Sequence, residues 1–197
     1  MIPLRYRIIR PYLASFIHRR FERPPLPEIL HWLTQPGKEK RAMQYIEQRN
    51  DSDDFTEIRF SGIAEPFYYP RNASWIDLCQ TVDEVFNSRN WHHFISENTP
   101  VDSSDTVVDC GAAEGLFSFF AAQHAKKVFA VEPVPMWHAA LDRTFHGFAN
   151  VEVMKIGVGH TNARLRMTND EIYSRVCAKG TLEIPICTLD SDYVSQG

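Results

Sequence analysis

The chain has 197 residues, of which 44% are hydrophobic and 23% are charged, and its formal net charge is -4. This composition is typical of a globular domain with a hydrophobic core. The slightly acidic balance argues against a general nucleic-acid binder. No apolar run reaches the roughly 18 residues that a membrane helix needs. We therefore expect a cytoplasmic protein without a transmembrane segment.

The cysteines and histidines give no sign of a disulfide framework or a metal centre. No Cys-x-x-Cys pair is present, so we interpret the thiols as reduced and structural: Cys79, Cys110, Cys177 and Cys187. The eight histidines lack metal-site spacing. His92 and His93 are adjacent, so on a strand their side chains would face opposite ways. We predict no metal site.

Residues 1–52 are predicted to form a basic, helical N-terminal extension. The first 23 residues carry six arginines against one glutamate, with apolar residues at roughly helical spacing. We favour a basic helix packed on the domain; the alternatives are a helix on a membrane surface or partner, and a transit-like segment. Prolines at 24, 25 and 27 suggest a hinge, followed by helices at 28–35 and 38–49.

Residues 53–100 are predicted to lead into the main domain with mixed helix and strand. FTEIRF (55–60) and PFYYP (66–70) have the composition of strands, separated by a turn at Gly62. Residues 75–87 have a helical pattern, and the aromatic cluster 91–94 follows. This lead-in would precede the part of the chain that carries the chemistry.

Residues 101–197 show strands alternating with helices. Apolar runs and turn residues predict strands at 106–110, 127–132, 151–156 and 182–188, helices at 114–126 and 135–146, and a polar connection at 160–180. Pro135 suits the first turn of the second helix, and Gly147 would stop it. Alternation of this kind indicates an α/β fold with a parallel, doubly wound, Rossmann-like sheet.

The first strand ends in a candidate cofactor turn. Asp109 lies at the strand tip and can hold an ammonium group. Gly111 lets a ligand approach the backbone, and Gly115 permits close packing where the helix begins. Amide groups at that helix start can receive a carboxylate. An amino acid head group needs both features side by side.

The second strand ends in an acid. Glu132 can accept two hydrogen bonds from ribose hydroxyls, and Pro133, Ile156 and Gly157 would flank a flat adenine ring. A dinucleotide site demands G-x-G-x-x-G, whereas Ala113 occupies the middle glycine position here. Glu114 would also place a carboxylate beside a pyrophosphate. The site therefore favours S-adenosylmethionine over a nicotinamide dinucleotide, and a ligand-free structural turn is the other alternative.

These residues resemble a known family. DCGAAEGLFSFF (109–120), including Ala112, resembles the D-x-G-A-x-x-G-x-F-S segment of the FkbM family of S-adenosylmethionine-dependent methyltransferases. Further segments of that family resemble the pair Glu132-Pro133, VEVMKIGVG (151–159) and ICTLDSDY (186–193). The resemblance extends over about residues 58–193. The resemblance implies a class I methyltransferase fold and O-methylation of a sugar or other small hydroxylated metabolite.

Two features depart from the family pattern. His160 stands where the family often has Asp. The family usually continues with a strand carrying Lys-x-Asp-x-Glu-Gly, which would pair beside the first strand and which this sequence lacks. We therefore expect a truncated or partial chain, with the C-terminal strands of the sheet missing, that self-associates and transfers no methyl group alone.

The sequence names no catalytic base. His92, His93 and Glu84 precede the cofactor strand and could cover the donor, although a structural role is favoured for each. Trp91 and Phe94 could line the pocket or belong to the core. Besides the methyltransferase, two functions stay open: a vestigial donor-binding module without activity, and an NAD(P)-dependent oxidoreductase.

Overall fold

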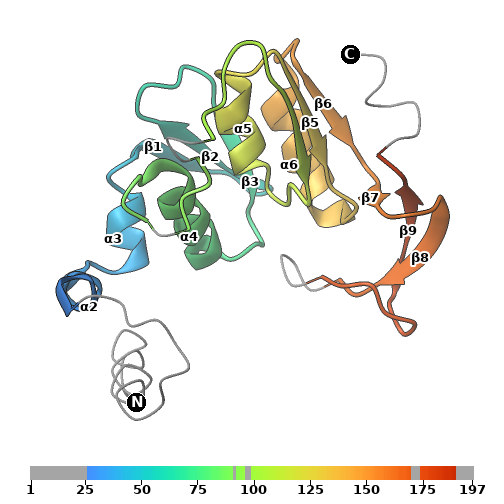
Figure 1. The fold of residues 1–197 in the computed structure, drawn as a ribbon, viewed down its shortest axis with the longest axis horizontal. Helices are drawn as coiled ribbons and strands as arrows, with labels where there is room; N and C mark the ends of the chain where they lie inside the picture. The colour runs from blue at the N-terminus through green and yellow to red at the C-terminus, as the bar shows by residue number, and fades with distance from the viewer. Residues whose placement is uncertain (1–25, 91, 96–98, 170–173, 190–197) are drawn as a thin grey trace.

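The computed structural model describes residues 26–90, 92–95, 99–169 and 174–189 (Figure 1). The basic segment at 1–23 and Trp91 lie outside these ranges. Within them the chain forms three small sheets, with strand orders β1-β2-β3, β4-β5-β6 and β7-β9-β8, and five helices, α2 to α6. The parallel sheet β4-β5-β6 makes this an α/β fold, as the alternating pattern predicts.

The N-terminal sheet is antiparallel and consists of β1 (Ile46–Asp51), β2 (Phe55–Phe60) and β3 (Phe67–Pro70). The strands predicted at 55–60 and 66–70 are confirmed. The helix predicted at 38–49 is wrong after α3 (Lys38–Ala42), because β1 follows and pairs with β2. In β1 only Ile46 is buried, so its sequence shows little strand alternation. β1 lies before residue 52 and β2 lies after it, so the β1–β2 hairpin spans the predicted end of the N-terminal extension.

The N-terminal part of the chain contains two further helices besides α3. The helix predicted at 28–35 corresponds to α2 (Leu26–Thr34), and the one at 75–87 corresponds to α4 (Trp75–Phe86). Ser74 caps α4, because its hydroxyl oxygen accepts a hydrogen bond from the Asp77 amide at 3.3 Å. α3 is fastened to α4 by an ion pair of 2.8 Å between Arg41 and the buried Asp83.

The parallel sheet consists of β4 (Thr106–Cys110), β5 (Lys127–Val131) and β6 (Val151–Met154). α5 (Leu116–Ala122) connects the first pair and α6 (Pro135–Phe145) the second, with Pro135 in its first turn. α5 is shorter than the helix predicted at 114–126, because residues 111–115 form a turn with several positive φ angles. Within the described residues β4 is an edge strand that pairs only with β5.

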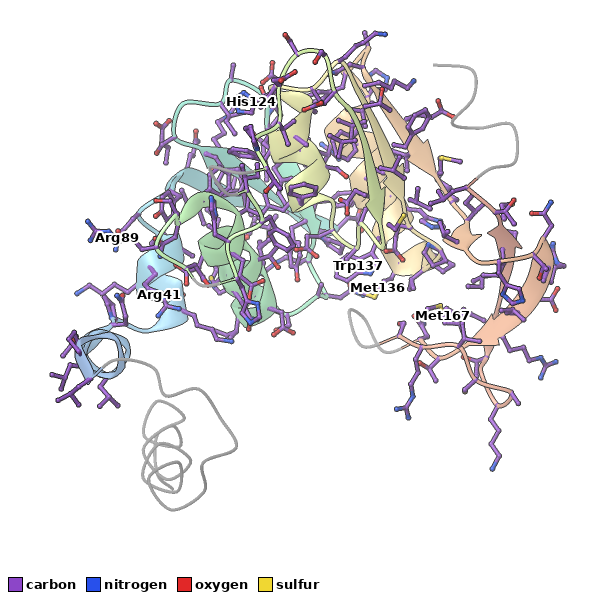
Figure 2. All side chains as sticks on the ribbon, viewed as in Figure 1. Arg41, Arg89, His124, Met136, Trp137 and Met167 are labelled. Carbon is purple, nitrogen blue, oxygen red and sulfur yellow. The ribbon has the colours of Figure 1, made fainter. Side chains whose placement is uncertain are left out.

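The core lies where α4, α5 and α6 meet the two sheets. Phe119 of α5 has its ring centroid 5.5 Å from that of Phe67 in β3, and Thr144 of α6 accepts a hydrogen bond from the Tyr68 amide at 3.0 Å. α5 and α6 also contact the parallel sheet, so they lie between the two sheets. Figure 2 shows Trp137 of α6 among the side chains of this core.

The third sheet corrects the predicted topology. We expected the strand at 182–188 to continue the doubly wound sheet, but β9 (Leu182–Cys187) pairs with β7 (Gly157–Val158) and β8 (Ala163–Met167) instead. The chain leaves the parallel sheet after Met154, two residues earlier than predicted, and β7 then pairs with β9. β8 falls within the segment predicted as a polar connection. Figure 1 shows this sheet projecting to one side of the molecule.

Candidate cofactor-binding site

The turn after β4 has an unusual backbone. Gly111, Ala113 and Gly115 have φ angles of 86°, 47° and 81°, in the left-handed region that residues other than glycine rarely adopt. The amides of Gly111 and Ala112 both donate to the carbonyl of Val131, at 2.9 and 3.0 Å, which fastens the turn to the end of β5. The turn therefore holds a fixed shape against the neighbouring strand.

The two glycines in this turn have different surroundings. A Cβ atom added to Gly111 would meet nothing within 4 Å, so there is open space beside the backbone at the end of β4. A Cβ added to Gly115 would lie 2.4 Å from Leu141 Cδ2 and 3.2 Å from Phe145 Cε2. The close packing predicted at Gly115 is confirmed, and its partner is α6. Gly111 has the open backbone that a close ligand approach requires.

Asp109 lies on the face of the sheet that α5 covers. Its Oδ2 accepts a hydrogen bond of 2.6 Å from the Ser118 hydroxyl. Burial raises the pKa of Asp109, and the hydrogen bond from Ser118 opposes this rise. The carboxyl group is thus held in place by α5 while it sits at the end of β4. The sequence predicts its position at the strand tip but gives no sign of its partner.

Glu132, at the end of β5, is only 4% exposed. Its Oε2 accepts from the Ala113 amide and its Oε1 from the Val134 amide, both at 2.7 Å. Burial raises the pKa of Glu132, although the two amide bonds favour the charged form. A carboxylate has about four lone-pair sites, so each oxygen keeps acceptor capacity for a ligand hydroxyl. The side chain also fixes Ala113 in its left-handed conformation.

A third carboxyl group, that of Glu114, lies within the turn. Glu114 is 4% exposed, and burial raises its pKa to about 7, with the charges of Asp109 and Glu132 adding to the rise. The hydroxyl group of Thr81 in α4 opposes this rise in the pKa. The signal in the sequence is a lone glutamate in an otherwise apolar stretch, GAAEGLF.

The predicted adenine-flanking residues are only partly brought together. Gly157 is buried, and a Cβ added to it would lie 3.7 Å from Pro133 Cβ and 2.6 Å from Ile186 Cδ1. Gly157 and Pro133 are therefore neighbours at the end of β5. Ile156 does not join them, since it lines a small cavity with Val108 and residues of β5 on the face away from Asp109.

The residues proposed to cover the donor have structural contacts. His93 Nδ1 lies 3.0 Å from the Glu84 carbonyl oxygen, and the Glu84 side chain accepts from Gln80 at 2.9 Å. Phe94 is half exposed, with its ring centroid 5.3 Å from that of Phe117. A different histidine lies beside the site: His138 Nε2 is 2.8 Å from the Glu132 carbonyl oxygen, and burial lowers its pKa.

Comparisons of this chain with models of known protein families, with curated proteins and with solved structures find no match. Among the residues that the structure describes, no helix combines the length and apolar character needed to cross a membrane. In the same ranges, no group of three or more His, Cys, Asp or Glu side chains could hold a metal ion.

Proposed function

We propose that this chain binds S-adenosylmethionine where β4 and β5 end, and that it is a methyltransferase of the FkbM type. One observation carries the proposal: Asp109, the left-handed turn and Glu132 meet at the ends of two adjacent parallel strands. Ligands of open α/β sheets bind outside the carboxyl ends of the strands. The resemblance of residues 109–120 to the FkbM pattern points the same way.

The residues present fit the chemical groups of the donor. Asp109 would hold the methionine ammonium group, and the open space at Gly111 would receive the methionine end along the backbone of Ala112. Glu132 would accept the ribose hydroxyls with its remaining lone pairs. Pro133 and Gly157 would border the adenine. Burial disfavours the charged forms of Asp109 and Glu132, and a cationic ligand would compensate for that cost.

When bound, S-adenosylmethionine supplies a methyl group that is already activated by the positive charge on sulfur. The contribution of the chain is then mainly positioning, which can be worth several kcal/mol. The buried carboxylate of Glu132, the partly buried carboxylate of Asp109 and the rigid turn would orient the donor. The acceptor we propose is a hydroxyl group of a sugar or another small metabolite, as the family resemblance implies.

The assignment is tested with S-adenosylhomocysteine in isothermal titration calorimetry. Replacing Glu132 by alanine removes two charge-assisted hydrogen bonds to ribose, each worth roughly 1.5 to 3 kcal/mol, so affinity should fall at least about tenfold. Glu152→Ala is the matched control, because Glu152 lies on β6 with its side chain 47% exposed. We expect no binding of NAD. Unchanged affinity in Glu132→Ala, or binding of NAD, would contradict the proposal.

A second variant covers the case in which Glu132→Ala loses its fold. Glu132 also holds the amides of Ala113 and Val134, whereas Gly111 borders open space. Gly111→Val would fill the space through which the donor approaches and would strain the turn at its φ angle of 86°, so it should abolish binding, and cooperative thermal unfolding checks that the fold is retained. A folded Gly111→Val protein with normal affinity would contradict the close-approach argument.

A further inference from the structure

A pocket lies at the C-terminal end of α6, away from the candidate cofactor site. It is lined by residues from the segments 65–68 and 143–148, and its volume is about 390 Å³. Glu132 precedes the other end of α6, which has 11 residues and is therefore about 16 Å long. Pockets of a few hundred Å³ hold small molecules in many proteins. This pocket is thus large enough for a small ligand of its own.

The two walls of the pocket are held together by the fold. Thr144 of α6 is only 4% exposed, and its hydroxyl oxygen accepts a hydrogen bond of 3.0 Å from the Tyr68 amide of β3. Both residues line the pocket, and α6 packs along β3 (Figure 1). A ligand would therefore bind to a preformed site, which lowers the cost of ordering the protein around it.

Arg143 brings a positive charge to the pocket. Its guanidinium carbon lies 4.4 Å from the centroid of the Tyr68 ring and 5.3 Å from that of the Phe55 ring. These cation–π contacts keep the guanidinium beside Tyr68. In the described part of the chain, none of the ion pairs within 4.0 Å includes Arg143. A guanidinium has five N–H donors in a fork that matches a carboxylate, so Arg143 can bind the carboxylate of a ligand.

Glu65 brings a negative charge to the same pocket. It is exposed, and no ion pair within 4.0 Å includes it among the residues that the structure covers. Arg143 and Glu65 therefore line one pocket without forming an ion pair with each other. The last carbonyl groups of α6 carry partial negative charge and also favour a cation. A ligand with one negative and one positive group matches this arrangement.

Apolar surface completes the pocket. Pro66 and Phe148 line it beside Tyr68. Phe148 is partly buried, and its ring centroid lies 5.8 Å from that of Phe119 and 5.6 Å from that of Phe145, so the core holds this ring in place. Such surface favours an apolar group on the ligand.

We propose that this pocket binds a free amino acid with an apolar side chain. Arg143 holds the α-carboxylate, Glu65 holds the α-ammonium group, and Pro66 and Phe148 contact the side chain. The inference goes beyond the proposed function and does not depend on it, because the described residues that line this pocket include none of those assigned to the donor.

The wild-type protein is titrated with L-phenylalanine and L-leucine in ligand-observed NMR. A ligand of this size should bind with a dissociation constant on the order of 1 mM. N-acetyl-L-phenylalanine lacks the ammonium charge, and L-phenylalaninamide lacks the carboxylate. Each should bind at least about fivefold more weakly than L-phenylalanine, because each loses a charge-assisted hydrogen bond.

Variants assign the binding to this pocket. Arg143→Gln and Glu65→Gln each remove one charge and should weaken amino acid binding at least about fivefold. Arg164→Gln and Glu183→Gln are the matched controls, because they break an exposed ion pair on the third sheet, and they should keep wild-type affinity. Cooperative thermal unfolding checks each fold. Glu65 is exposed, so Glu65→Gln keeps the test open if Arg143→Gln, which loses its contact with Tyr68, does not fold.

The candidate cofactor site is also proposed to hold an amino acid head group, so saturating S-adenosylhomocysteine is added as a competitor. Amino acid binding should persist in its presence, and Arg143→Gln should keep wild-type affinity for S-adenosylhomocysteine. The inference is wrong if neither amino acid binds, if the competitor displaces it, if both derivatives bind as tightly as L-phenylalanine, or if Arg143→Gln and Glu65→Gln keep full affinity. If S-adenosylhomocysteine does not bind, the proposed function is overturned, and the variants still decide the role of this pocket.

Discussion

The sheets β4-β5-β6 and β7-β9-β8 follow each other along the chain, but they differ in how they are covered. In β5 the residues Val128 to Val131 are all buried, because the strand lies between β4 and β6 and α5 packs on it. In β8 the residues Ala163 to Arg166 are all exposed, because the strand pairs with β9 and none of the helices α2 to α6 packs on it. Coverage by helices, more than strand pairing, distinguishes the two regions.

This difference explains where the candidate site lies. Buried surroundings raise the pKa of Asp109, Glu114 and Glu132 and hold the turn in its left-handed shape. Polar pairs on the third sheet, such as Arg164 with Glu183 at 2.8 Å, have both side chains more than half exposed. Water screens such a pair and leaves it little influence on ligand chemistry. Preorganised polar groups therefore belong to the covered sheet.

The largest difference between the regions should appear on truncation of an apolar side chain. Phe119 of α5 is completely buried, and its ring lies near those of Phe60, Phe67 and Phe148. Phe119→Ala should lower the free energy of unfolding by about 3 to 5 kcal/mol. Leu165→Ala on β8, where the leucine is 39% exposed, should change it by less than about 0.5 kcal/mol. If urea denaturation showed equal losses of unfolding free energy for Phe119→Ala and Leu165→Ala, the two sheets would not differ in how helices cover them.

A smaller difference should appear in the pH dependence of stability. The pKa of Glu114 rises from an ordinary value of 4.5 to about 7 in the folded protein. Between these values the unfolded chain loses a proton that the folded chain keeps, so stability falls as pH rises. The total loss, reached above pH 7, is on the order of 3 kcal/mol. The free energy of unfolding of the wild-type protein minus that of Glu114→Gln should fall in this way between pH 5 and pH 8.

Glu183→Gln is the control for that measurement, because Glu183 is exposed on the third sheet. This variant should keep the slope of the wild-type protein throughout the pH range. If the free energy of unfolding of Glu114→Gln has the same pH dependence as that of the wild-type protein, the pKa of Glu114 does not differ between the folded and unfolded states.

The smallest difference concerns single polar pairs. Ser118→Ala removes the 2.6 Å hydrogen bond to Asp109 in partly buried surroundings, which should cost about 1.5 to 3 kcal/mol. Arg164→Ala removes the exposed pair with Glu183, which should cost about 0 to 1 kcal/mol. Both are measured by thermal unfolding at low salt. A larger loss for Arg164→Ala than for Ser118→Ala would reverse the comparison.

The strands and helices of the covered sheet could be predicted from the sequence. The strand at 106–110 is found with the predicted bounds, and those beginning at 127 and 151 start where predicted. Each of these strands is an apolar run bounded by turn residues. In β5 the run is continuous because both faces of the strand are buried from Val128 to Val131. Pro135 marks the start of α6 for a similar local reason.

The elements that were missed depend on pairing partners far along the chain. β1 has one buried residue and reads as a helix, but the backbone groups of β2 give it a strand partner. β8 is exposed throughout most of its length, and pairing with β9, about 20 residues later, makes it a strand. β1, IEQRND, lacks the apolar alternation by which a strand is recognised in a sequence, and β8, ARLRM, has it over only five residues within a polar segment.

By itself, the sequence determined which residues end the first two parallel strands and that glycines are needed between Asp109 and α5. Strand ends and left-handed turns have local signatures, so Asp109, Gly111 and Glu132 could be named in advance. Only the tertiary structure decided that Ser118 holds Asp109, that Glu132 holds the amide of Ala113, and that Glu114 is buried against α4. These contacts depend on how α4 and α5 pack on the strand ends. Packing between elements that are far apart in the chain does not produce a recognisable residue spacing in the sequence.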